Sequence, residues 1–169
     1  TYYLTIGDSH IYMHSELEHI DLLCINDPTA IQNPLTLDGL QTNGTIFMQS
    51  PYGEANDVWT HIPPSVQKII REKNYKVYFC DMVKIAREMA SEADLQMRMQ
   101  GIVLLGAFLK LTPYAKNSNM NEEQVYQGVE KALYKYFGKR GDRVVADNLN
   151  CVKRGYKETK EIPATLIKG

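Results

Sequence analysis

The sequence contains few cysteines and no long apolar run. Its three cysteines, Cys24, Cys80 and Cys151, lie far apart and form no Cys-x-x-Cys pair. This pattern favours reduced thiols and predicts a cytoplasmic protein. No apolar stretch approaches the roughly 20 residues of a membrane-spanning helix, and the start TYYLTIGDSH lacks the basic and apolar regions of a signal peptide. We therefore expect neither membrane insertion nor secretion.

The chain also lacks a net charge of either sign and a glycine-rich phosphate loop. Nineteen basic and twenty acidic residues leave a formal charge of -1. No single-sign field is available to attract nucleic acid or an anionic membrane surface. A bare glycine-rich turn before a helix, the usual sign of a bound nucleotide, is absent. What is present is 44% hydrophobic residues in 169, enough for the core of one domain.

Apolar runs predict a series of strands in the first half of the chain. Residues 1–14 favour a hairpin, with Gly7, Asp8 and Ser9 at its turn. The runs at residues 19–26, 45–50 and 75–81 are typical of strands buried on both faces. Between them we expect a short helix over Leu35–Leu40, a turn at Thr42-Asn43-Gly44, and a helix over residues 65–74 after Pro63 and Pro64.

After Asp81 the apolar spacing becomes helical. Asn121 is a candidate N-cap, and Gly138 is placed to end the helix that follows. The predicted buried stripes are Met82, Ile85, Ala86 and Met89; then Met97, Ile102, Leu105, Phe108 and Leu109; then Val125, Val129, Leu133 and Tyr136; and, in a helix over residues 142–156, Val145, Leu149 and Val152.

Strands that alternate with helices across short connections predict an α/β fold. We expect a mostly parallel sheet with helices on its faces, a Rossmann-like three-layer arrangement, and a C-terminal helical cap. Residues 1–156 then form one domain. Residues 157–169 carry mixed charges and Pro163, and are predicted to be a tail that lies loose or wraps onto a partner.

Polar residues follow the predicted strands at Asn26, Asp27, Ser50 and Asp81. Ligands of open α/β sheets bind beyond the carboxyl ends of the strands, so these four residues are the candidate cofactor-binding positions. The competing interpretation is that they cap helices and turn the chain, as Asn, Asp and Ser commonly do.

Two other patterns suggest chemistry. Residues 4–10, LTIGDSH, resemble the nucleophile block of GDSL-type esterases, in which Ser9 would attack an ester. That mechanism needs a late acid and histidine, and no histidine follows His61, so we favour a hairpin turn. His10 and His14 share one face of a strand, but with His19 they lack the three or four well-placed ligands of a zinc site.

Several stretches, in order, resemble the gamma subunit or fused gamma-type domain of the pyruvate and 2-oxoacid:ferredoxin (flavodoxin) oxidoreductases. They are IDLLCINDPTAI, GLQTNGTIFMQSP, VYFCDMVKIAREM, GIVLLGAFLKLTP and VEKALYKYFGKRGDRVVADNLNCVKRGY. The resemblance covers most of residues 18–156. The family's domain begins with a glycine-rich strand-turn-helix that this sequence lacks, which implies that this part is truncated or supplied by another chain.

The resemblance implies an accessory domain of a thiamine-diphosphate-dependent enzyme that converts a 2-oxoacid, pyruvate foremost, to an acyl-coenzyme A. The complex would use thiamine diphosphate, magnesium, iron–sulfur clusters and coenzyme A, and would pass electrons to ferredoxin or flavodoxin. The three scattered cysteines supply no cluster. We therefore expect no catalytic residue here, no resident cofactor, and the enzyme's other domains or subunits as partners. The alternative is a free-standing α/β module that binds a nucleotide or coenzyme A without catalysis.

Overall fold

The structure, a computed structural model, describes residue 10, residues 19–90 and residues 93–169; at 93 and 94 only the backbone is described. The elements are, in chain order, β1 (Ile20–Ile25), η1 (Pro28–Gln32), η2 (Pro34–Leu37), β2 (Leu40–Gln49), α1 (Ala55–His61), α2 (Pro64–Glu72), β3 (Lys76–Cys80), α3 (Met82–Met89), α4 (Ala93–Leu111), α5 (Tyr114–Asn117), α6 (Glu122–Phe137), η3 (Gly138–Arg140), α7 (Asp142–Glu158), β4 (Lys160–Glu161) and α8 (Ala164–Lys168).

The described residues form a four-stranded sheet in the order β1-β2-β3-β4. Strands β1, β2 and β3 are parallel, and β4 pairs antiparallel with β3. Side chains alternate between the two faces of each strand, so Phe47 packs on one face while its neighbours Ile46 and Met48 pack on the other. The prediction of an α/β fold with a mostly parallel sheet is confirmed.

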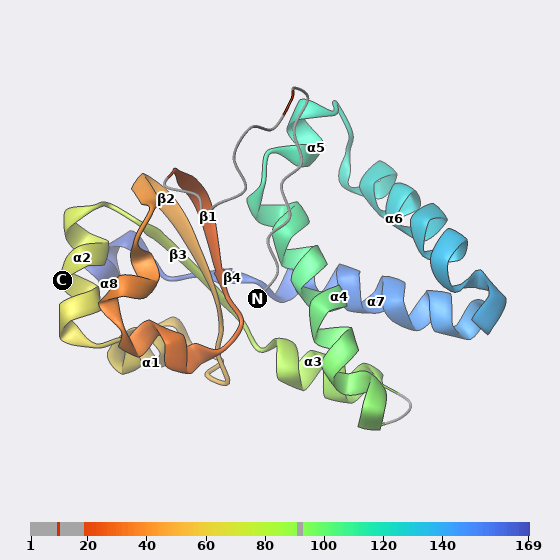
Figure 1. Ribbon diagram of the computed structural model, residues 1–169, viewed down its shortest axis with the longest axis horizontal. Coiled ribbons are helices and arrows are strands. Elements are labelled where there is room, and N and C mark those ends of the chain that lie inside the picture. Colours follow the sequence, from red (N-terminus) through yellow and green to blue (C-terminus); the bar gives the residue numbers. More distant parts are fainter. Residues whose placement is uncertain (1–9, 11–18, 91–92) are drawn as a thin grey trace.

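Helices cover both faces of this sheet (Figure 1). On one face α1, α2 and α8 pack over a core that includes Val58, Ile70 and Ile167. On the other, α3, α4 and α7 pack over Phe47 and Cys80. The connections from β1 to β2 and from β2 to β3 both run over the first face, and α3, α4 and α7 cover the second. Helices α3, α4 and α7 therefore build the second layer.

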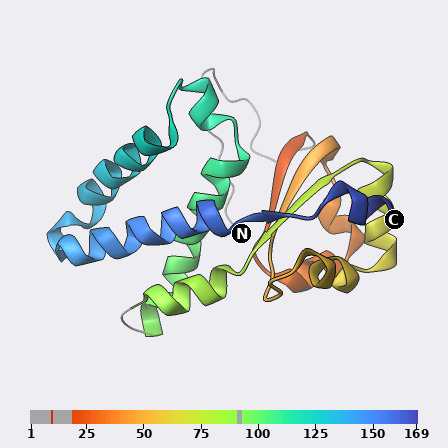
Figure 2. The same cartoon turned by 180° about the vertical axis from the view of Figure 1, so that it is seen from behind.

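Helices α6 and α7 extend away from the sheet and run side by side (Figure 2). The side chain of Asn121 accepts a hydrogen bond from the Gln124 amide at 2.9 Å, and the Gln124 side chain accepts from the Asn121 amide at 2.9 Å. This reciprocal capping box starts α6 where the sequence predicts a cap. The predicted inward residues of α7, Val145, Leu149 and Val152, are buried.

Two helical stripes are only partly as predicted. In α4, Met97, Leu105 and Phe108 are exposed to 81%, 37% and 45%, although the sequence places them inward. In α6, Tyr136 is 73% exposed. Helix α4 is apolar all round from Gly101 to Leu109, so spacing alone does not identify its buried face. In the structure, that face is the one packed against α3 and α7.

The segment before β2 also differs from the prediction. The expected helix over Leu35–Leu40 is a 3-10 turn, η2, that follows a first such turn, η1. The expected turn at residues 42–44 lies within β2, where Asn43 has a φ of 66° and accepts a 2.7 Å hydrogen bond from the Asn74 side chain. The pairing of β1 with β2 shifts register at this point, so the irregular backbone is absorbed as a bulge.

The prediction of a loose C-terminal tail is wrong. Residues 157–158 complete α7, β4 adds a strand to the sheet, and α8 packs on α2. Ile162 is 1% exposed and Ile167 is 7% exposed. This short segment of mixed charge contains two buried isoleucines, and the spacing of apolar residues in the sequence does not predict their burial. Over the part of the chain the structure describes, no helix combines the length and apolar composition needed to cross a membrane.

Candidate functional site

Strands β1, β2 and β3 are parallel, so their carboxyl ends meet at one edge of the sheet. A cleft of about 410 Å³ opens there. The residues that line it and bear on its chemistry are Asn26, Asp27, Gln49, Asp81, Lys84 and Arg87. Three of the four predicted positions, Asn26, Asp27 and Asp81, are therefore brought together. The fourth, Ser50, does not line this cleft.

Asp27 is held as a capping residue at the start of η1. One carboxylate oxygen accepts hydrogen bonds from the Thr29 amide at 2.9 Å and from the Thr29 hydroxyl at 2.7 Å. Both bonds favour the charged form, so they lower the pKa of the Asp27 carboxyl below its ordinary value. The side chain is exposed, which leaves its second oxygen available to a ligand in the cleft.

Asp81 and Gln49 together hold the start of α3. Asp81 Oδ1 accepts from the Lys84 amide at 3.0 Å and from Gln49 Nε2 at 3.2 Å. The Gln49 Oε1 atom accepts from the Met82 amide at 2.7 Å. Gln49 is 4% exposed. Its bond to the Met82 amide gives a partner to one of the helix-start amides that have none within the helix. The capping interpretation of Asp81 therefore has direct geometric support.

Ser50 is buried just below the edge. Its hydroxyl oxygen accepts from the Tyr52 amide at 3.2 Å, and its own amide donates to the Cys80 carbonyl at 3.1 Å. Ser50 lines a separate cavity of about 230 Å³, beside Tyr52 and His61, whose rings stack with centroids 4.1 Å apart. Ser50 therefore belongs to the smaller cavity and not to the larger cleft.

Sequence reasoning missed Lys84 and Arg87, which give the cleft its positive charge. Both lie on α3, three residues apart and therefore on one helical face. The sequence does contain a pattern that predicts them. A helix that follows a parallel strand begins at the carboxyl edge of the sheet, and two cations three residues apart in its first turns therefore lie near that edge. Two cations beside Asp27 and Asp81 suit a ligand that carries both an anionic group and hydroxyl or amino donors.

Among the described residues, the other reactive side chains are engaged in separate local contacts. Ser9 and His14 lie outside the described residues. His19 Nδ1 accepts from Gln41 Nε2 at 3.1 Å, and His61 Nδ1 donates to the Asp57 carbonyl oxygen at 2.7 Å. Among the described residues, no three His, Cys, Asp or Glu side chains are placed to hold a metal ion.

The cysteines have the chemistry of core residues. Cys80 and Cys151 are buried, Cys24 is half-buried, and none forms a disulfide. Burial raises the pKa of the Cys80 thiol to about 12 and that of Cys151 to about 11. Cys24 and Cys80 are separated by the intervening strand β2, and Cys151 lies on α7. This donor set does not suit an iron–sulfur cluster, which needs thiolates gathered around one centre.

Comparison with known proteins agrees with the resemblance found in the sequence. The model of the family described as pyruvate ferredoxin/flavodoxin oxidoreductase matches residues 1–158. A pyruvate-flavodoxin oxidoreductase from Trichormus variabilis is 29% identical over 119 residues, which are 70% of this chain and 9% of that protein. The pyruvate:ferredoxin oxidoreductase of Moorella thermoacetica is 23% identical over 160 residues, 95% of this chain and 13% of that one.

A solved structure shares the fold. The pyruvate oxidoreductase subunit PORC from Thermotoga maritima superposes with a TM-score of 0.58 at 20% identity, covering 87% of this chain and 67% of that subunit. The chain thus spans only a small part of the length of the curated relatives it matches. It covers about two thirds of the PORC subunit. The match of the family model over nearly the whole chain places this protein in the pyruvate ferredoxin/flavodoxin oxidoreductase family.

Proposed function

We propose that this chain is an accessory gamma-type domain of a thiamine-diphosphate-dependent 2-oxoacid:ferredoxin or flavodoxin oxidoreductase, with pyruvate as the substrate. The observation that carries the proposal is the family match over residues 1–158 in a chain that makes up 9% and 13% of two relatives. In this proposal the decarboxylation and the electron transfer take place on other domains. The role of this domain is to pack on them and to complete the complex.

The arrangement of the described side chains supports a non-catalytic role. The thiols of Cys80 and Cys151 are neutral at ordinary pH because burial raises their pKa values, so neither is an activated nucleophile. Asp81 and Gln49 are engaged in holding α3. Three cysteines without a disulfide suit a reducing compartment, so the proposal places the complex in the cytoplasm.

The test is reconstitution of the complex. The chain is co-expressed with the products of neighbouring genes and isolated through an affinity tag. We expect a thiamine-binding subunit and an iron–sulfur subunit to co-purify, and pyruvate- and coenzyme A-dependent reduction of ferredoxin or flavodoxin to require the chain. Absence of both partners from the purified material, with the chain itself folded, would contradict the proposal.

The cleft at the carboxyl edge supports a second candidate, a free-standing module that binds a nucleotide or coenzyme A. Lys84 and Arg87 suit phosphate, while Asn26 and Asp27 suit hydroxyl or amino groups. A ligand that binds only the folded state raises the melting temperature. We expect coenzyme A to stabilise the isolated chain if this candidate is right, and a Lys84→Gln/Arg87→Gln variant to lose the effect. Lys68→Gln on α2, outside the cleft, is the matched control.

The two candidates differ in what the isolated chain does. The module candidate requires a melting-temperature shift by coenzyme A without any partner. The accessory-domain candidate requires partner binding, and it is compatible with a melting temperature that coenzyme A does not change. An unchanged melting temperature together with partner binding would therefore favour the accessory domain over the free-standing module.

A further inference from the structure

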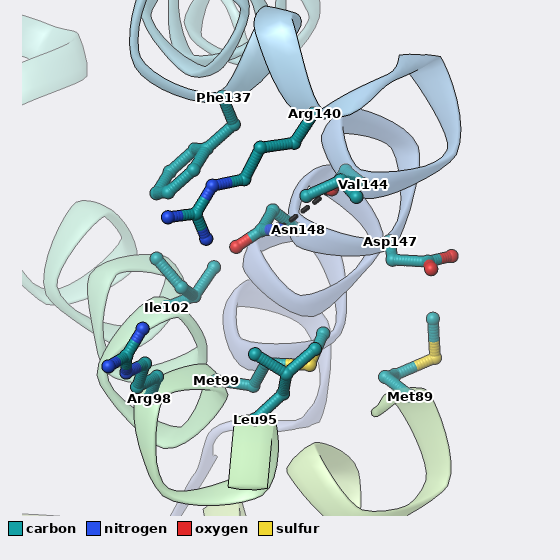
Figure 3. A pocket seen from close by; sticks show the side chains of 10 residues that line it. All are labelled: Met89, Leu95, Arg98, Met99, Ile102, Phe137, Arg140, Val144, Asp147 and Asn148. Carbon is teal, nitrogen blue, oxygen red and sulfur yellow. Dashed lines mark hydrogen bonds between the residues drawn. The ribbon is translucent and has the colours of Figure 1, made fainter. Parts of the chain in front are cut away.

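A second and separate cavity, of about 430 Å³, lies among the helices on the far side of α3 (Figure 3). Its walls come from α3, α4, α7 and the junction of α6 with η3. The apolar part of the lining includes Met89, Met99, Ile102 and Phe137. The volume lies within the range of about 300–1,000 Å³ that is typical of small-molecule pockets.

Two guanidinium groups lie at one end of this cavity. Arg98 comes from α4 and Arg140 from η3, and Figure 3 shows both side chains on the side opposite Met89 and Asp147. Both arginines are exposed at the protein surface. Among the described residues, no salt bridge uses either of them, whereas Asp147 is paired with Arg143 at 3.9 Å. The cavity therefore combines an apolar interior with two positive charges that no described residue pairs.

A buried amide adds a polar contact to the interior. Asn148 is 9% exposed, and its Nδ2 atom donates to the Val144 carbonyl at 2.7 Å. This bond fixes the orientation of the amide, and the carbonyl oxygen of Asn148 faces the cavity in Figure 3. Oriented polar groups in an otherwise apolar cavity are the usual basis of ligand orientation.

We propose that this cavity binds a small organic anion, a carboxylate with an apolar chain or ring, whose body contacts Met89, Met99 and Phe137 and whose acid group meets Arg98 and Arg140. Guanidinium groups form two parallel hydrogen bonds with a carboxylate, which suits this end of the cavity. The opposite end, where Asp147 lies, disfavours a second acidic group. The site goes beyond the proposed function, since it needs no partner domain and lies apart from the cleft at the carboxyl edge.

Methionine methyl groups report on the site directly. The full chain is labelled with ¹³C-methyl methionine and titrated with octanoate, while NMR follows each methyl signal. We expect the Met89 and Met99 signals to shift together and to saturate, with a dissociation constant on the order of 1 mM, since small ligands gain little energy per atom. Met48, buried in the core on the other face of the sheet, should not shift.

Matched compounds and variants separate charge recognition from unspecific apolar binding. Octan-1-ol, which has the apolar chain without the charge, should bind roughly tenfold more weakly because it loses the charge-assisted hydrogen bonds. Arg98→Gln and Arg140→Gln should each weaken octanoate binding by about three- to tenfold. Lys139→Gln, a neighbouring cation that does not line the cavity, is the control and should leave binding unchanged.

A further variant keeps the test informative if an arginine variant unfolds. Val144→Phe should fill the cavity and remove octanoate binding while both arginines remain. The proposal is overturned if the methyl shifts do not saturate, if Met48 shifts as much as Met99, or if octanoate and octan-1-ol bind equally well. It is also overturned if folded Arg98→Gln and Arg140→Gln variants keep the full affinity. Each of these outcomes is independent of whether the chain assembles with partners.

Discussion

Gly106 and Gly155 allow α4 and α7 to cross at close range. A Cβ atom at Gly106 would collide with the Val152 carbonyl oxygen, and one at Gly155 would collide with the Val103 carbonyl oxygen. Both obstacles are backbone, which moves only if a whole helix moves. The glycine of the Leu105-Gly106-Ala107 stretch thus has a packing reason in this fold.

We predict that Gly106→Ala destabilises the protein by roughly 1–3 kcal/mol, the usual cost of overpacking, even though alanine has the higher helix propensity. The measurement is urea unfolding followed by circular dichroism. Gly128→Ala is the control, since nothing lies within 4 Å of a Cβ atom at that position of α6. It should be neutral or stabilising by up to about 1 kcal/mol. Equal effects of the two variants would contradict the crossing argument.

The buried thiols link stability to alkaline pH. The pKa values of about 12 for Cys80 and about 11 for Cys151 lie above the value of about 8.5 for an unfolded thiol. The folded state therefore keeps a proton that the unfolded state loses. This contribution to stability is complete below pH 8.5 or so and is lost as the pH rises toward the folded-state values.

We predict that the free energy of unfolding falls between about pH 9 and pH 11, and that it falls less steeply in a Cys80→Ala/Cys151→Ala variant. Urea unfolding at a series of pH values measures both slopes. The comparison of slopes removes the shared contribution of tyrosines and lysines, which titrate in the same range. Parallel slopes in the two proteins would show that the thiols are not responsible.

At the scale of elements, the C-terminal segment closes one face of the sheet. The Ile162 amide donates to the Val77 carbonyl at 2.8 Å, and the Ile167 carbonyl accepts from Arg71 Nε at 2.6 Å. These contacts join β4 to β3 and α8 to α2. The buried side chains of Ile162 and Ile167 complete the apolar core on that face.

We predict that deletion of residues 160–169 costs about 3–6 kcal/mol, the value for exposing two buried isoleucines. Thermal unfolding should show a large drop in melting temperature, and a dye that binds apolar surface should fluoresce with the truncated chain. Deletion of Lys168 and Gly169 alone removes neither isoleucine and should leave the melting temperature nearly unchanged. A stable protein after the longer deletion would show that α8 is dispensable.

The sequence identifies most elements and misplaces a few. The apolar runs over β1 and β3 and the apolar stripe of α7 predict their elements well, because each of these elements packs against the core along most of its length. Helix α1 was missed, since its seven residues are mostly polar and only Val58 and Trp59 are buried. Strand direction predicts that Asn26, Asp27, Ser50 and Asp81 lie at one edge of the sheet, but it does not exclude Ser50 from the cleft found there. The direction of a side chain after a strand depends on the turn that follows.

At the scale of the whole molecule, α4 presents an apolar face that no described residue covers. Met97, Leu105 and Phe108 lie on it with spacings of eight and three residues, which place them on one side of the helix. No charged residue occurs between Arg98 and Lys110. A contiguous apolar face of this kind is typical of a protein interface.

We predict that the isolated chain self-associates as its concentration rises, and that a Leu105→Glu/Phe108→Glu variant stays monomeric. Light scattering coupled to size-exclusion chromatography measures the mass. Tyr136→Glu on α6, which is more exposed than Leu105 or Phe108 but lies on another helix, should not change the association. If the proposed complex forms, the same double variant should also weaken partner binding. A wild-type chain that remains monomeric at high concentration would argue against an interface on α4.

The sequence by itself determined the α/β class, the three parallel strands, the N-cap of α6 and the family, because each depends on residues close together in the chain or on their order along it. Only the tertiary structure decided which side of α4 is buried, that residues 157–169 pack against the sheet and α2, and that Arg98 and Arg140 line one cavity. The physical reason is that spacing within an element reports its periodicity, whereas burial depends on which distant element packs against it.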